Sequence, residues 1–420
     1  EWEAGQTGQI ILRKGVHKHS ICGKANCSDN HGTDKKWTAI STLSEINGSG
    51  SYFLTKDVEL DGTWSCIEGY NVELCLNGNT ITSKRAVDAI IVASGASLTI
   101  TDCNASVGKI THNTDQSGSG IYVGGSLTLW NGSITGNKHL QQGAVHVAVG
   151  GTFTMNGGSI TENKTNGGVQ VAGGEFYMNG GEITLNTDGY SGVYVYSGEF
   201  TMTGGEITQN TSEHYSGGVY VAADGKFYMK GGNITENTGK DSGGVYASGT
   251  FTMTGGEITK NKYTSEYGGG SGVYVGYGGA FTMSGGKITE NENSIANGSS
   301  GVYVSYNSTF NMTNGEITGN VNSAATGGGG VNVGGTFNMT GGKITGNTNS
   351  AANGGGGVYV AGSGKFTMNG GEITGNNTTS TDDSCAGGVF IDTYGGFTVS
   401  GAAKIIDNWK NGELEAGVYK

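Results

Sequence analysis

Hydrophobic and polar residues alternate in short stretches along this chain, and one such pattern recurs ten times between Phe153 and Phe397. The repeat is best written F-[TYN]-[MV]-x-G-G-x-I-T-x-N, followed by a loop and then G-V-Y-V. The alternating stretches are too short for helices, and a period of two is that of a strand with one buried face. Glycine pairs suit the tight turns between such strands, and the chain has no proline to interrupt a hydrogen-bonded ladder.

The spacing of the repeats limits the possible architectures. Successive copies begin 23 to 31 residues apart, a period typical of solenoids and propellers. Three short strands per copy predict one coil of a parallel β-helix, whereas a propeller blade needs four strands in about 40 residues or more. Nearly all the length variation falls in the segment after the asparagine. Because parallel crossovers are almost always right-handed, we predict a right-handed parallel β-helix.

The pattern extends upstream in a degraded form. Leu127 to Ile134 and Leu74 to Ile81 keep the 7-residue spacing between the first apolar residue and the isoleucine, and Leu98 starts a coil with an insertion around Cys103. We therefore predict an all-β chain, with about thirteen coils over residues 51–420 and a small Cys/His-containing cap or linker at residues 1–50. Stacked apolar rows would fill the core. An asparagine row is expected to form an internal amide ladder, comprising Asn113, Asn137 and Asn163 through Asn376.

The repeated F-T-M-x-G-G-x-I-T-x-N units resemble the right-handed β-helix repeats of large surface proteins of gram-positive gut bacteria, a group related in fold to pectate lyases. The resemblance covers about residues 51–420. It implies a secreted or cell-surface bacterial protein that is adhesin-like or interacts with carbohydrate. It transfers no catalytic residue, because no lyase active-site motif occurs in the sequence.

Composition agrees with an extracellular rod. Thirty-five acidic against 23 basic residues give a net charge of -12 without a basic stripe, which argues against a nucleic-acid partner. No apolar run approaches the ~18 residues of a membrane span. The chain begins at Glu1 without a methionine and its last residues read like a fresh G-V-Y-V strand, so we expect a fragment of a longer exported protein, with the β-helix continuing beyond it.

The first 50 residues contain the densest set of metal-binding side chains. His19, Cys22, Cys27 and His31 are our predicted zinc ligands, with His17 as an alternate, because tetrahedral zinc takes thiolate and imidazole ligands in fours. In an exported protein, a disulfide between Cys22 and Cys27 is a rival interpretation.

The four remaining cysteines lie within the repeat region. Cys385 is about eleven coils from Cys103, so at ~4.8 Å per coil it cannot form a disulfide with Cys103 or with the earlier Cys66 and Cys75. At least one of the other three is also unpaired within the chain if Cys22 pairs with Cys27.

A tyrosine row marks the outward position of the V-Y-V strands. We name it the tyrosine stripe and take it as the candidate binding surface; it consists of Tyr122, Tyr194, Tyr220, Tyr246, Tyr274, Tyr303 and Tyr359. His146, Gln170 and Asn332 interrupt the row. Stacked tyrosines stabilise neighbouring strands, so the row has a purely structural interpretation. Its functional interpretation is an exposed set of flat faces for sugar rings or for an apolar partner.

Catalytic signals are sparse. A glycan-active enzyme needs paired carboxylates, or a carboxylate with a basic residue, on neighbouring coils. The candidates are His146 with Gln170, Asp188 and His214 in later loops, and Asp382 with Asp383 in the longest loop.

Three functions therefore stay open. The first is a noncatalytic extracellular rod that binds glycan or protein through the tyrosine stripe and the adjoining loops. The second is a polysaccharide lyase or glycoside hydrolase, and the third is a structural spacer.

Overall fold

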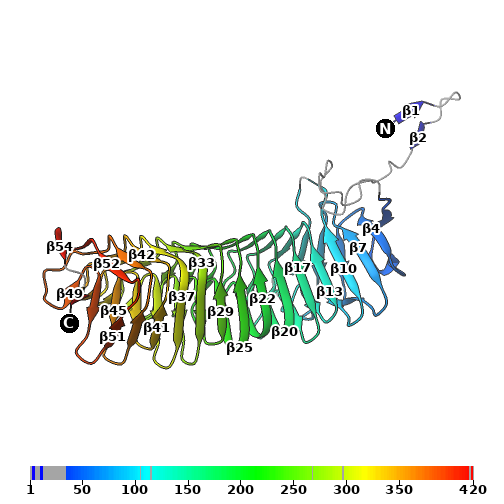
Figure 1. Ribbon diagram of the computed structural model, residues 1–420. Coiled ribbons are helices and arrows are strands. Elements are labelled where there is room, and N and C mark those ends of the chain that lie inside the picture. Colours follow the sequence, from blue (N-terminus) through cyan, green and yellow to red (C-terminus); the bar gives the residue numbers. More distant parts are fainter. Residues whose placement is uncertain are drawn as a thin grey trace.

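The computed structural model describes residues 35–415 except 105, 114–115, 267 and 296–297, together with the strands β1 (Trp2–Ala4), β2 (Ile10–Leu12) and β55 (Val418–Tyr419). The chain forms a parallel β-solenoid of about twelve turns, an elongated rod in which the sequence advances steadily from one end to the other (Figure 1). The predicted all-β fold is confirmed, and the one described helix is the short 3-10 turn η1 (Leu43–Glu45).

Three rows of parallel strands form the faces of the rod, as the three strand types of the repeat predict. The phenylalanine row consists of β3 (Thr38–Ile40), β4 (Gly50–Leu54), β7 (Asn71–Cys75), β10 (Ser97–Thr101), β13 (Ser126–Leu129), β17 (Thr152–Met155), the second halves of β20 (Val169–Met178), β22 (Val193–Met202) and β25 (Val219–Met229), β29 (Thr250–Met253), the first halves of β33 (Ala280–Thr289) and β37 (Thr309–Thr318), β41 (Thr336–Met339), β46 (Lys365–Met368) and β51 (Gly396–Val399).

The isoleucine row consists of β5 (Val58–Leu60), β8 (Thr80–Ser83), β11 (Lys109–His112), β14 (Ser133–Thr135), β18 (Ser159–Thr161), β21 (Glu182–Thr184), β23 (Glu206–Thr208), β26 (Asn233–Thr235), β30 (Glu257–Thr259), the ends of β33 and β37, β42 (Lys343–Thr345), β47 (Glu372–Thr374) and β52 (Lys404–Ile406). The valine row consists of β6 (Trp64–Cys66), β9 (Ile90–Val92), β12 (Ile121–Val123), β16 (Val145–Ala148), the first parts of β20, β22 and β25, β28 (Val245–Ala247), β32 (Val273–Val275), β36 (Val302–Val304), β40 (Val331–Val333), β45 (Val358–Val360), β50 (Val389–Ile391) and β55.

The segments after the asparagines, expected to be loops, also carry short strands that pair from coil to coil. One set consists of β15 (Lys138–His139) with β19 (Lys164–Thr165), and then β24 (Thr211–Ser212), β27 (Thr238–Gly239), β31 (Lys262–Tyr263), β34 (Glu292–Asn293), β38 (Val321–Asn322), β43 (Thr348–Asn349), β48 (Asn377–Thr378), β53 (Asn408–Lys410) and the antiparallel β54 (Glu413–Glu415). A second consists of β35 (Gly298–Ser299), β39 (Thr326–Gly328), β44 (Asn353–Gly355) and β49 (Cys385–Ala386). These strands form because loops of similar length leave the same corner in the same direction.

Stacked apolar rows fill the interior. The phenylalanine side chains from Phe153 to Phe366 are at most 1% exposed, and neighbouring rings have centroids between 4.6 and 5.0 Å apart. This separation matches the strand spacing, so each ring stacks on the ring of the next coil. At one end, Ile40, Leu43 and Ile46 join this core, so β3 and η1 pack on the first coil.

The register of the upstream coils corrects one prediction. Leu74 pairs with Ile100, whereas Val72 pairs with Leu98 and occupies the position that phenylalanine takes in later coils. Both Val72 and Leu74 point inward, so a period of two could not distinguish them. The 7-residue spacing from Leu74 to Ile81 is therefore coincidental, whereas Leu127 does pair with Phe153 as predicted.

The amide ladder is confirmed from Asn137 onward and continues to Asn408. Each Asn Nδ2 donates to the Oδ1 of the next asparagine at 2.9–3.1 Å and to the carbonyl of an isoleucine on the preceding coil. Asn113 was wrongly included, because its side chain is exposed. The first rung is instead His112, which is 4% exposed and has Nδ1 2.7 Å from Asn137 Oδ1.

Backbone conformation explains two repeat positions. The second glycine of the pair has a positive φ, as at Gly256 (82°), where an added Cβ would lie 2.6 Å from Met229 Cε of the preceding coil. The residue before each ladder asparagine is also left-handed even when it is not glycine, as at Glu236 (56°) and Lys260 (55°). The left-handed conformation directs the side chain of this residue outward at the corner.

Candidate binding surface

The valine row carries the tyrosine stripe on its outer side. Tyr194, Tyr220, Tyr246, Tyr274 and Tyr303 occupy equivalent positions on consecutive coils. Their neighbouring ring centroids lie 4.8–5.2 Å apart, in stacked, edge-on or tilted arrangements. The predicted row of tyrosines on the outer side of the V-Y-V strands is therefore present in this central part of the rod, although not every pair of rings is stacked.

The stripe is less exposed than predicted. Tyr194 and Tyr359 retain only 7% and 8% of their surface, and the other five members are half-buried. The cause is the loops after the asparagines: Tyr215 stacks on Tyr220 at 4.4 Å, and Tyr190 packs edge-on against Tyr194 at 5.1 Å. The sequence placed these loops beside the stripe but gave no sign that they fold onto it.

Burial makes several phenols of the stripe harder to ionise. It raises the pKa of Tyr194 and of Tyr246 to about 12, and neighbouring tyrosines add to the shift for Tyr194. Burial likewise raises the pKa of Tyr220. An ordinary tyrosine, with a pKa of about 10, is already neutral at physiological pH. These three tyrosines therefore offer hydroxyl groups and ring edges rather than phenolates, and they do so to a higher pH than an exposed tyrosine would.

The interruptions of the stripe have structural explanations. Gln170 is 7% exposed, and its Oε1 lies 3.0 Å from His146 Nδ1 and accepts the Gly143 N–H at 3.0 Å. His146 itself stacks on Tyr122 at 5.3 Å. Asn332 is 6% exposed and its Nδ2 donates to the Gly298 carbonyl at 3.3 Å.

A second set of tyrosines, which the repeat pattern did not single out, is well exposed. Tyr277 and Tyr306 are each the second residue after a strand, β32 and β36 respectively. They are 68% and 66% exposed, and their ring centroids lie 6.5 Å apart. Tyr196, 57% exposed, directly follows Val195 within β22 of an earlier coil, and its ring centroid lies 6.0 Å from that of Tyr194. Their signal in the sequence is a tyrosine shortly after V-Y-V.

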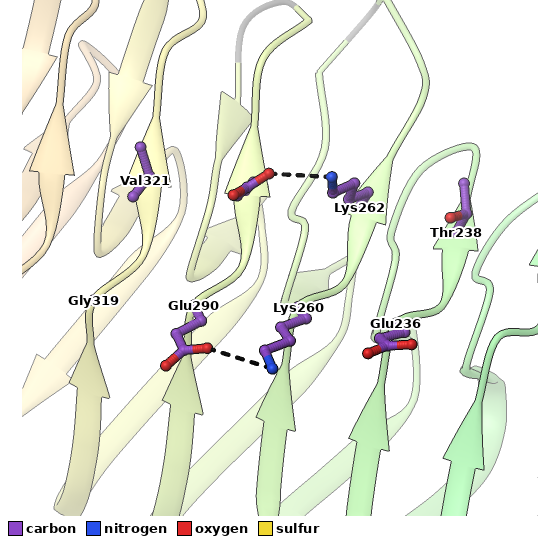
Figure 2. Close-up of a pocket in the computed structure, with 8 residues that line it drawn as sticks. Glu236, Thr238, Lys260, Lys262, Glu290, Gly319 and Val321 are labelled. Carbon is purple, nitrogen blue, oxygen red and sulfur yellow. Dashed lines mark ion pairs between the residues drawn. The ribbon is translucent and has the colours of Figure 1, made fainter.

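A separate groove lies at the corner that follows the isoleucine row. It encloses about 580 Å³ and is lined by two parallel ranks of side chains, Glu236, Lys260 and Glu290 in one and Thr238, Lys262 and Glu292 in the other, with Gly319 and Val321 beyond them (Figure 2). Lys260 Nζ lies 3.9 Å from Glu290, and Lys262 Nζ lies 3.1 Å from Glu292. These pairs are more than half exposed, so each contributes little to stability and can exchange its partner for a bound ligand.

Apart from His146 and Gln170, the candidate catalytic residues contact structural neighbours rather than one another. Asp188 lies 3.8 Å from Lys164 Nζ, and His214 contacts the ring of Tyr190 at 5.6 Å. Asp382 belongs to a local turn in which its carbonyl accepts the Cys385 N–H at 3.2 Å. His146 and Gln170 contact each other as a structural pair within the stripe.

The predicted zinc ligands His19, Cys22, Cys27 and His31 lie outside the described residues. Among the residues that are described, no three or more His, Cys, Asp or Glu side chains are grouped closely enough to hold a metal ion. Over the same part of the chain, the structure contains no helix of the length and apolarity that crossing a bilayer requires.

Fold and surface together define the class of this protein as a parallel β-solenoid with aromatic and charged ladders on its outer faces. Comparison with known proteins adds no narrower assignment, since no family model, curated protein or solved structure matches the chain.

Proposed function

We propose that this chain is a noncatalytic extracellular rod of a bacterial surface protein that binds a glycan or protein partner through the tyrosine stripe and the exposed tyrosines beside it. The observation that supports this proposal is the alignment of tyrosines on one face of consecutive coils. An exposed pair, Tyr277 and Tyr306, lies in the turns that directly follow the strands of Tyr274 and Tyr303.

The stripe and the exposed pair adjoin each other. Gly276 precedes Tyr277, and a Cβ added to Gly276 would lie 2.8 Å from the Tyr246 hydroxyl. The residue before Tyr277 therefore lies against the hydroxyl of a stripe tyrosine. A tyrosine side chain has few rotatable bonds, so it loses little conformational entropy when a sugar or an apolar side chain packs on its ring.

Glycan-array and extracellular-matrix binding of the wild-type chain, compared with a Tyr277→Ser, Tyr306→Ser double variant, tests the proposal. Aromatic contacts contribute about 0.5–1.5 kcal/mol each, so loss of two rings should weaken binding roughly fivefold or more. Val149→Ser is a matched control, because Val149 is 81% exposed in the corresponding turn of another coil.

Four outcomes separate the functions considered. Binding that falls in the double variant but not in the control supports the proposal. Equal binding by the double variant and the control would mean that the partner contacts another part of the surface. Binding to no glycan or matrix protein would favour a structural spacer. Release of oligosaccharide from mucin or an acidic polysaccharide would instead establish an enzyme.

A further inference from the structure

Two cysteines lie in contact at the start of the rod. Cys75 is the last residue of β7, and Cys103 follows β10 by two residues. β7 and β10 pair in parallel with Cys75 opposite Thr101, so the two thiols project from adjacent coils. Their sulfur atoms are 3.3 Å apart.

The other two described cysteines have different surroundings. The Cys66 thiol donates to the Ser97 carbonyl at 3.5 Å, and the Cys385 thiol donates to the Ala351 carbonyl at 3.2 Å. Both are fully buried. Each of these thiols therefore contacts a backbone oxygen, whereas Cys75 and Cys103 contact each other.

The backbone around Cys103 is fixed. The preceding Asp102 is 0% exposed, and its carboxylate accepts the backbone N–H groups of Gly78, Asn104 and Gly108. These bonds tie both ends of the insertion after β10 to the turn after β7. Cys103 is therefore held beside Cys75 instead of lying on a free loop.

We propose that Cys75 and Cys103 form an oxidative modification site, at which a small disulfide such as oxidised glutathione converts the two thiols into a disulfide that links the first coils. The sulfur atoms need to approach from 3.3 Å to about 2.05 Å, a change that side-chain rotation can provide.

The thiol–disulfide exchange with the donor proceeds in two steps. The Cys103 thiolate attacks one sulfur of the donor, which forms a mixed disulfide and releases the first donor thiolate. The Cys75 thiolate then attacks the Cys103 sulfur, which forms the Cys75–Cys103 bond and releases the second. Two protons leave the protein, and the donor takes up its two electrons.

The surroundings assign the order of attack. Cys75 is fully buried, whereas Cys103 is half-buried and accessible to a small donor. The contact with Cys103, together with burial, raises the pKa of the Cys75 thiol, so Cys75 reacts second, once the mixed disulfide is beside it.

Incubation of the full chain with oxidised glutathione, followed by alkylation under denaturing conditions and peptide mapping, tests the proposal. The expected result is a crosslinked Cys75–Cys103 peptide pair, lighter by two hydrogen atoms than the reduced pair and abolished by a thiol reductant. Cys66 and Cys385 should be alkylated in full.

The Cys103→Ser variant should lose the crosslinked pair and leave Cys75 open to alkylation after denaturation, whereas a Cys385→Ser control should keep the pair. Full alkylation of Cys75 and Cys103 after oxidation of the wild-type chain would overturn the proposal. So would a crosslink of either residue to Cys22, Cys27 or a second molecule in place of the expected pair.

Discussion

Replacement of one ladder asparagine, Asn261→Ala, should destabilise the rod far more than loss of a surface amide. The Asn261 Nδ2 donates to Asn291 Oδ1 at 3.1 Å and to the Ile234 carbonyl at 2.9 Å. Its Oδ1 accepts the Asn237 Nδ2 at 3.1 Å and the Asn237 backbone N–H at 3.0 Å. All three asparagines are 0% exposed, so water does not replace these bonds without local opening.

The size of the destabilisation depends on which groups lose their hydrogen-bond partners in this variant. Asn237 Nδ2 keeps the Ile207 carbonyl at 2.8 Å, and Asn291 Oδ1 keeps the Asn261 N–H at 3.0 Å. The Asn237 backbone N–H loses the acceptor that Asn261 Oδ1 provides, at a cost of about 1–3 kcal/mol for a buried donor. The other lost bonds contribute roughly 0.5–1.5 kcal/mol each, so the total is about 3 kcal/mol or more.

The assay is urea unfolding followed by circular dichroism, with Asn179→Ala as the matched control. Asn179 also links coils, since its Nδ2 donates to Asn156 Oδ1 at 2.9 Å and its Oδ1 accepts the Thr203 hydroxyl at 2.8 Å, but its side chain is exposed. That variant should cost no more than about 0.5 kcal/mol. Equal unfolding midpoints for the two variants would refute the reasoning that burial makes the inner ladder strong.

Three further predictions address the core, the loops and the stripe. Phe251→Ala removes one ring from the stack and should cost about 3–5 kcal/mol in urea unfolding, with Phe251→Leu costing clearly less; similar values would argue against tight packing. Thr378→Asn should raise the thermal midpoint, because the buried Asn349 Nδ2 of the preceding coil lacks a partner and Thr378 occupies the register position opposite it; an unchanged or lower midpoint would contradict this. Burial raises the pKa of Tyr194 and Tyr246 to about 12, so the folded state favours the neutral phenol. This stabilisation is complete below the ordinary tyrosine pKa of about 10 and is lost as the pH rises to about 12, which ultraviolet titration of the phenolate measures; ionisation of all tyrosines near pH 10 without unfolding would disprove it.

Most of the fold could be predicted from the local sequence pattern, because every coil repeats the same arrangement of strands, turns and ladder asparagine. The spacing from Phe153 to Ile160 and Asn163 defines strand, turn and ladder rung in each copy, and the rows stack as expected. The prediction failed where the repeat is degraded. Near Val72, Leu74 and Asn113, no neighbouring copy of the repeat is similar enough to fix which residues pair between coils.

The candidate surface was predicted in position but not in exposure. The alternation in V-Y-V places Tyr220 on the outer side, and the structure agrees. That Tyr215 covers it depends on how a loop of variable sequence folds back over the strand. The exposed Tyr277 and Tyr306 lie outside the fixed repeat positions, so periodicity carried no information about them.

The sequence by itself determined the parallel stack, its buried rows and its amide ladder, because these depend on residues that recur at fixed spacing and on hydrogen bonds between identical positions. Only the tertiary structure decided which tyrosines reach solvent, which lysine faces which glutamate, and that Cys75 meets Cys103. Each of these contacts joins residues on different coils through turns and loops whose lengths vary, so the pairing is set by three-dimensional register rather than by local pattern.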